Sequence, residues 1–101
     1  MMMAHDSSPT PPAGLAEDTI NAVRAALVHY LRAPSNPSEL RDALNRMADE
    51  ARSKSILPEH LLVALKGLWS SLPEVRSVGD ADEQTRMLQR VVTMCIREYY
   101  G

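Results

Sequence analysis

The sequence predicts an all-α protein, a compact antiparallel bundle of four helices with a disordered N-terminal tail. Four stretches carry apolar residues at steps of three and four, and strand-like alternation never extends beyond two or three residues. Aromatic residues make up only 4% of the chain and Phe is absent, so aliphatic side chains and six methionines must fill the core. Such residues suit helix interfaces better than sheet faces. Short connections between the four stretches imply antiparallel neighbours.

The chain divides into a tail, residues 1–14, and a helical domain, residues 15–101. Its length of 101 residues is enough for one domain and not for two. Pro9, Pro11 and Pro12 stand among small polar residues that can neither form a helix nor bury apolar area, which predicts a flexible segment. A proline-rich stretch can also bind a partner domain, but this one lacks flanking basic residues. We therefore interpret it as an unstructured leader.

The first two helices have clear apolar faces. The first is predicted over Leu15 to Arg32, ends before Pro34, and places on one face Ile20, Val23, Leu27, Tyr30 and Leu31. The second begins at Asn36, with Pro37 at the first helical position and Glu39 three residues after the asparagine, a strong start signal. Its apolar face comprises Leu40, Leu44, Met47, Ala48 and Ala51.

Charges on the second helix predict which face is exposed. Asp42, Arg46 and Glu50 follow one another at i, i+4 spacing opposite the apolar face. Such a ladder of alternating charge supports a solvated helix surface. We expect all three side chains to face solvent.

The third helix has the widest apolar arc and is expected to be the centre of the core. It begins at Pro58 and ends before Pro73, and its apolar side chains are Leu61, Leu62, Leu65, Leu68, Trp69 and Leu72. Residues 74–79 are expected to form a loop. Asp80 and Glu83 then predict a capping box that opens the fourth helix, whose core side holds Leu88, Val91, Val92, Cys95 and Tyr99.

The composition and the N-terminal sequence limit the cellular location and the partners that we expect. The net charge of −2 and the pI near 5.9 are unlike the basic balance of a general nucleic-acid binder. Cys95 is the only cysteine, so the chain can form no internal disulfide, which fits a reducing compartment. The N-terminus lacks a basic segment followed by an apolar run, and the longest apolar run, Leu61 to Leu65, is too short to span a bilayer. We expect a cytoplasmic protein without a membrane segment.

The residue types that carry catalysis are scattered. His5 lies in the tail, His29 on the polar side of the first helix and His60 in the first turn of the third, with no acidic residue at ligand spacing from either helical histidine. Cys95 lies within an apolar face, where a buried thiol acts as a small apolar group. The sequence therefore predicts no enzyme, no metal site and no cofactor.

Arginines on the last helix form the first candidate partner surface. Arg86, Arg90 and Arg97 lie within a narrow arc opposite the core, with Gln89 and Thr93 beside them. Such a stripe can hold phosphate or an acidic partner. The plainer interpretation is an ordinary solvated face.

Small and apolar residues off the core face of the third helix form the second candidate. Val63, Gly67 and Ser71 would let a partner helix approach closely, with Val28 or Tyr100 alongside. The alternative is that the fourth helix covers this surface within one chain. From these features we expect an interaction or regulatory module that binds a protein partner or forms a homodimer. A phosphate or nucleic-acid binder acting through the arginine stripe is the alternative.

Overall fold

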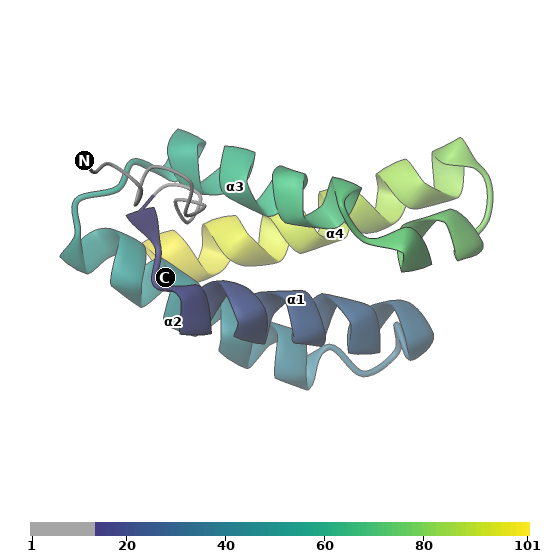
Figure 1. Ribbon diagram of the computed structural model, residues 1–101, viewed down its shortest axis with the longest axis horizontal. Helices are drawn as coiled ribbons and strands as arrows, with labels where there is room; N and C mark the ends of the chain where they lie inside the picture. The colour runs from purple at the N-terminus through teal and green to yellow at the C-terminus, as the bar shows by residue number, and fades with distance from the viewer. Residues whose placement is uncertain (1–13) are drawn as a thin grey trace, which may run out of the picture.

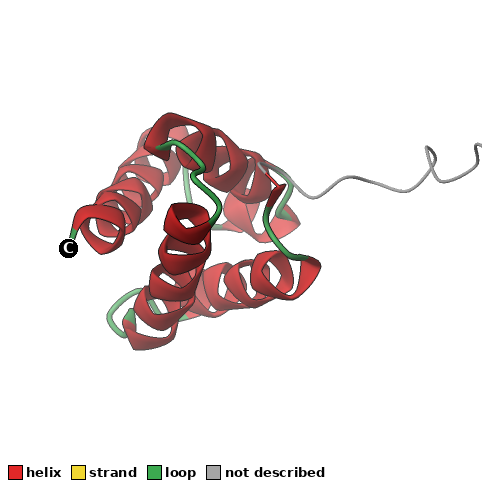
Figure 2. Ribbon diagram, turned by 90° about the vertical axis from the view of Figure 1, so that its left-hand side faces the viewer, coloured by secondary structure: helices red, strands yellow, loops and turns green. Residues whose placement is uncertain are grey.

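The computed structural model describes residues 14–101 and confirms the all-α bundle of four helices (Figure 1). The elements are α1 (Glu17–Arg32), α2 (Ser38–Ser53), α3 (Pro58–Ser70), the 3-10 helix η3 (Pro73–Ser77) and α4 (Ala81–Tyr100). Helices that follow one another in the chain run antiparallel, and α4 lies behind the space between α3 and the α1–α2 pair. Across the described residues the view along the bundle shows helices and loops only (Figure 2). The predicted tail, up to residue 13, lies outside the described residues.

The centre of the bundle is α2 rather than α3. The most extensive helix–helix packing joins α2 to α1 and to α4, whereas α3 packs mainly on α4. The buried side chains of α2 are Leu40, Ala43, Leu44, Met47, Ala48 and Ala51. The small side chains of the three alanines leave room on the surface of α2, so two neighbouring helices can approach it closely. The expectation for α3 was wrong because it counted large apolar residues, while a central helix needs small ones as well.

Glu50 connects the end of α2 to the start of α1. Its Oε2 accepts hydrogen bonds from the Ala16 N–H at 2.6 Å and from Lys54 Nζ at 2.5 Å, and its Oε1 accepts one from the Thr19 hydroxyl. The Glu50 side chain is only 15% exposed. It does not face solvent as the i, i+4 ladder suggested, because two of its three partners, Ala16 and Thr19, come from the start of α1.

These contacts set the protonation of the Glu50 carboxyl. Burial by itself would raise its pKa, but the hydrogen bonds from Lys54, Thr19 and Ala16, together with the nearby Lys54 charge, outweigh burial and lower the pKa below its ordinary value of 4.5. The carboxylate is therefore the form that stabilises the fold.

The other end of the α1–α2 pair is joined by His29 and Glu39. His29 Nδ1 lies 2.8 Å from Glu39 Oε1 across the connection that contains Pro34 and Pro37. The predicted start signal of α2 is only partly correct. Pro37 is the N-cap residue and no side chain caps the helix. Asn36 lies one residue too early, and the Glu39 carboxylate contacts the histidine.

The C-terminal end of α4 is held against α2 and the α2–α3 connection. Arg52 donates to the Tyr99 carbonyl oxygen at 2.6 Å, which satisfies a backbone acceptor that the helix end leaves free. The Asn45 side chain donates to Glu98 Oε1, and the Tyr99 hydroxyl donates to the Ile56 carbonyl oxygen at 2.9 Å. The last turn of α4 is thereby fixed beside the start of α3.

At its other end, α4 begins as predicted. Asp80 is its N-cap residue, and Asp80 Oδ1 accepts a hydrogen bond from the Glu83 N–H at 2.9 Å. The segment before it, expected to be a loop, contains the short helix η3, which begins at Pro73 and buries Val75 against the core.

Leu65 is fully buried, so Leu65→Ala is expected to lower the free energy of unfolding by about 2–5 kcal/mol, the usual range for a large-to-small core change. Urea unfolding followed by circular dichroism measures this. Ser70→Ala, at an exposed position of the same helix, is the control and should change stability little. Equal effects of the two variants would contradict the orientation of α3.

Glu50→Gln is expected to cost about 1–3 kcal/mol at pH 7, because one amide oxygen cannot replace two carboxylate oxygens that accept three hydrogen bonds. The folded pKa of Glu50 is depressed, so its contribution is present above pH 4.5 and is lost as the pH falls through the folded value. The stability difference between the parent protein and Glu50→Gln should therefore narrow on acidification below pH 4.5. Asp42→Asn, at an exposed position of α2, should show neither effect.

Candidate functional site

The three arginines of the predicted stripe lie on the exposed side of α4. Arg86, Arg90 and Arg97 are all exposed, and the helix places them on one side because they are four and seven residues apart. Arg86 lies 3.8 Å from Glu83, a distance at which an ion pair between exposed side chains contributes little. Within residues 14–101, Arg90 and Arg97 have neither an ion pair nor a side-chain hydrogen bond.

The arginines face a hollow between α4 and the α1–α2 connection, which we call the arginine hollow. Its volume is about 530 Å³, and it is shallow and widely open to solvent. Its lining residues are Tyr30, Pro34, Pro37, Arg86, Gln89, Arg90, Thr93, Met94 and Arg97. None of these residues is acidic, so the hollow combines positive charge with an apolar wall.

The apolar wall of the arginine hollow could not be predicted from the sequence. Tyr30 is buried at the end of α1, and Pro34 and Pro37 belong to the connection that follows it. The sequence identified Tyr30 as a core residue and the prolines as helix boundaries. Only the packing of α2 between α1 and α4 brings these residues opposite the arginines.

The two parts of the predicted partner surface lie apart in the structure. Val63, Gly67 and Ser71 are exposed on α3, and α3 contributes no residue to the arginine hollow. Val63 is 69% exposed, so α4 does not cover it. The two candidates are therefore separate surfaces.

The residues named as possible companions of Val63 differ in burial. Val28 is half-buried against the core and is not part of an exposed surface. Tyr100 is 71% exposed, and its ring packs edge-on against Tyr99 with 5.2 Å between centroids.

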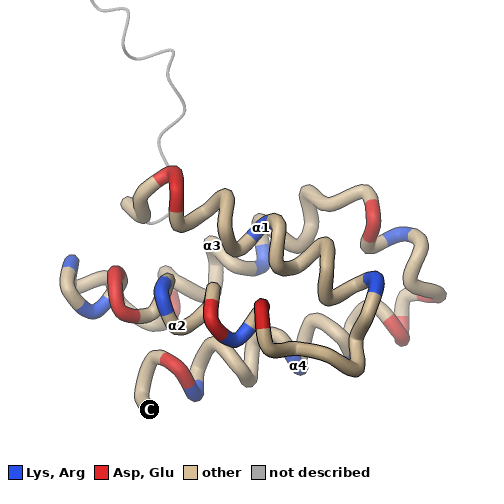
Figure 3. The backbone as a smooth tube through the Cα atoms, turned by 90° about the horizontal axis from the view of Figure 1, so that it is seen from below, with Lys and Arg blue, Asp and Glu red and all other residues tan. Residues whose placement is uncertain are grey.

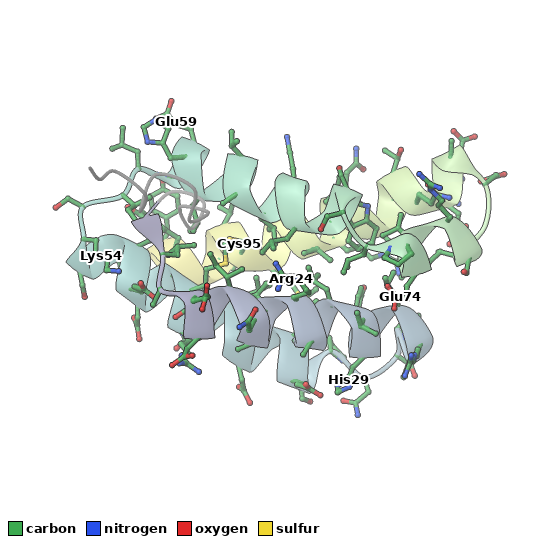
Figure 4. The ribbon with its side chains drawn as sticks, viewed as in Figure 1. Arg24, His29, Lys54, Glu59, Glu74 and Cys95 are labelled. Atoms are coloured by element: carbon green, nitrogen blue, oxygen red, sulfur yellow. The ribbon has the colours of Figure 1, made fainter. Side chains whose placement is uncertain are left out.

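The histidines and the cysteine do not lie together. His29 pairs with Glu39, His60 is exposed in the first turn of α3, and Cys95 is buried inside the bundle (Figure 4). Within residues 14–101, no group of three or more His, Cys, Asp or Glu side chains is placed to hold a metal ion. Among the helices of residues 14–101, none has both the length and the apolar character needed to cross a bilayer.

Acidic and basic residues are interspersed along the described backbone rather than separated into long stretches of one sign (Figure 3). Along α2, for example, Asp42, Arg46, Asp49 and Arg52 alternate in sign. The concentration of positive charge around the arginine hollow is therefore local.

No family model, curated protein or solved structure matches this chain.

Cys95 is expected to react slowly with a disulfide reagent. Burial, and then the Glu98 carboxylate, raise the pKa of its thiol to about 11, so almost no thiolate is present at neutral pH. Its labelling by dithionitrobenzoate at pH 8 should be far slower in the folded protein than in guanidinium chloride. Equally fast labelling in both conditions would show that the thiol is accessible in the folded bundle.

Proposed function

We propose that this protein is a cytoplasmic interaction module without catalytic activity, which binds an acidic segment of a partner protein in the arginine hollow. One observation carries the proposal. Three arginines and an apolar wall surround a single hollow in which no lining residue is acidic. Carboxylates that enter this hollow would meet guanidinium groups, which form charge-assisted hydrogen bonds with them.

The apolar wall supports a peptide rather than a nucleic acid as the ligand. Pro34, Pro37 and Met94 can contact an apolar side chain that lies between acidic residues of a peptide. A nucleic acid would instead require an extended basic surface that follows many phosphates. The interspersed charge along the described backbone and the net charge of −2 do not provide one.

The geometry also favours binding over chemistry in this hollow. Its lining residues include no histidine, cysteine or carboxylate that could act as a nucleophile or as a general base at neutral pH. The hydroxyl of Thr93 donates to the Gln89 carbonyl oxygen within α4 at 2.9 Å. The hollow therefore offers charge, hydrogen bonds and apolar contact to a ligand.

A fluorescently labelled peptide of alternating glutamate and leucine tests the proposal by fluorescence anisotropy. We expect saturable binding that weakens as salt rises, and no binding of the matched peptide with glutamine in place of glutamate. Arg90→Glu and Arg97→Glu should each weaken binding by about tenfold, because an attractive contact becomes repulsive. Arg46→Glu, the same charge change on the outer face of α2, should have little effect.

Three outcomes would contradict the proposal. The first is the absence of peptide binding at low ionic strength. The second is an equal effect of Arg46→Glu and Arg90→Glu, which would indicate attraction to overall charge rather than to the hollow. The third is tighter binding of mixed-sequence DNA or RNA than of the peptide, which would assign the arginines to phosphate.

A further inference from the structure

The outward face of α3 carries residues that the packing within a single chain does not explain. Glu59, Val63, Lys66, Gly67 and Ser70 fall on this face because they follow one another at i, i+4, i+7, i+8 and i+11. All five residues are exposed. We call them the α3 outer face.

Val63 is the large apolar side chain of this face, and it is 69% exposed. The other exposed large apolar side chains of the described residues are Leu57, Ile96 and Tyr100. Leu57 directly precedes α3, and the hydrogen bond from Tyr99 to Ile56 places the end of α4 beside it. Two of the exposed apolar side chains, Leu57 and Val63, therefore belong to the start and the first half of α3.

Gly67 is not required by the fold of one chain. It is not among the residues with positive φ, and a Cβ added there would meet nothing within 4 Å. Glycine inside a helix is less favourable than alanine. Its absence of a side chain leaves a low point on the α3 outer face, where a second helix can approach closely.

The charges of the α3 outer face are self-complementary. Glu59 and Lys66 are seven residues apart on the same flank, with Val63 near the midpoint between them. Glu59 points away from the bundle at the start of α3 (Figure 4). Neither residue has an ion pair or a side-chain hydrogen bond among residues 14–101.

A twofold axis near Val63 would use both charges. If a second α3 crosses the first in the antiparallel direction, Glu59 of each copy faces Lys66 of the other. A twofold axis of this kind places each flank of one helix against the same flank of its partner, while the two helices run in opposite directions. Gly67 and Ser71, near the end of one α3, therefore lie opposite the start of the second α3. The exposed Leu57 of the second copy is then next to these small residues.

We propose that the α3 outer face is the interface of a homodimer, in which two α3 helices pack antiparallel around Val63. A second copy fits this face better than an unrelated helix, since it supplies an opposite charge to Glu59 and to Lys66 through one symmetry operation. α3 contributes no residue to the arginine hollow, although Lys66 lines a neighbouring groove on α4 together with Gln89 and Thr93, which also line that hollow. One helix pair buries less surface than the roughly 1,200–2,000 Å² of a stable complex, so the dimer dissociates on dilution.

Sedimentation velocity of the full chain, from micromolar to millimolar concentration, measures the monomer–dimer equilibrium. We expect a reversible shift toward the dimer, and loss of that shift in Val63→Glu, which buries two unpaired charges at the axis. Circular dichroism confirms that the variant folds, which its exposed position favours. A monomer at every concentration, or a dimer unchanged by Val63→Glu, would overturn the proposal.

Charge exchange then tests the antiparallel arrangement. Glu59→Lys and Lys66→Glu each turn two attractive pairs into repulsive ones and should weaken dimerisation by about tenfold. The double variant should dimerise like the parent protein, and the two single variants mixed together should form a heterodimer. Asp42→Lys and Arg46→Glu are the matched changes on α2 and should have no effect. If the single exchanges have no effect, or the double variant does not recover, the Glu59–Lys66 pairing is wrong.

Discussion

Most of this structure depends on the requirement that α2 pack against two helices at once. Its buried side chains include three alanines, which keep its surface low and allow α1 and α4 to lie close on different sides. Glu50 then holds the start of α1 to the end of α2, and His29 contacts Glu39 where the two helices are connected. This packing places the α1–α2 connection opposite α4. Without it, the arginines of α4 would form a flat exposed row rather than one side of a hollow.

Charged side chains in the described residues serve two different purposes. Glu50 and Arg52 make contacts between elements that satisfy backbone groups at helix ends. Arg90, Arg97, Glu59 and Lys66 make no comparable contact within residues 14–101. Charged groups of the second kind are the ones that contact a partner in the two complexes that we propose.

The sequence predicted what depends on single helices and missed what depends on pairs of helices. Apolar spacing predicted the four helices and the burial of Leu65, and the Asp80–Glu83 pair predicted the start of α4. Glu50 was assigned to the solvent because i, i+4 spacing considers only one helix. The arginine stripe was identified, but its apolar wall was not, since Tyr30 and the two prolines lie 49 or more residues earlier in the chain than the arginines. Whether a helix face is covered depends on how the helices pack against one another. The spacing of residues along one helix carries no information about that packing.

The two sides of the arginine hollow differ in stiffness. The rings of Pro34 and Pro37 fix their φ angles, and the Tyr30 ring is held in the core, so this wall would lose little conformational entropy in the proposed complex. Each exposed arginine has several rotatable bonds and must be ordered against whatever anion enters. A rigid surface that accepts one shape therefore faces mobile groups that accept many positions of negative charge. In the complex that we propose, such a combination would discriminate strongly by the sign of a ligand's charge and only weakly by the spacing of its acidic groups, so several related acidic sequences would bind.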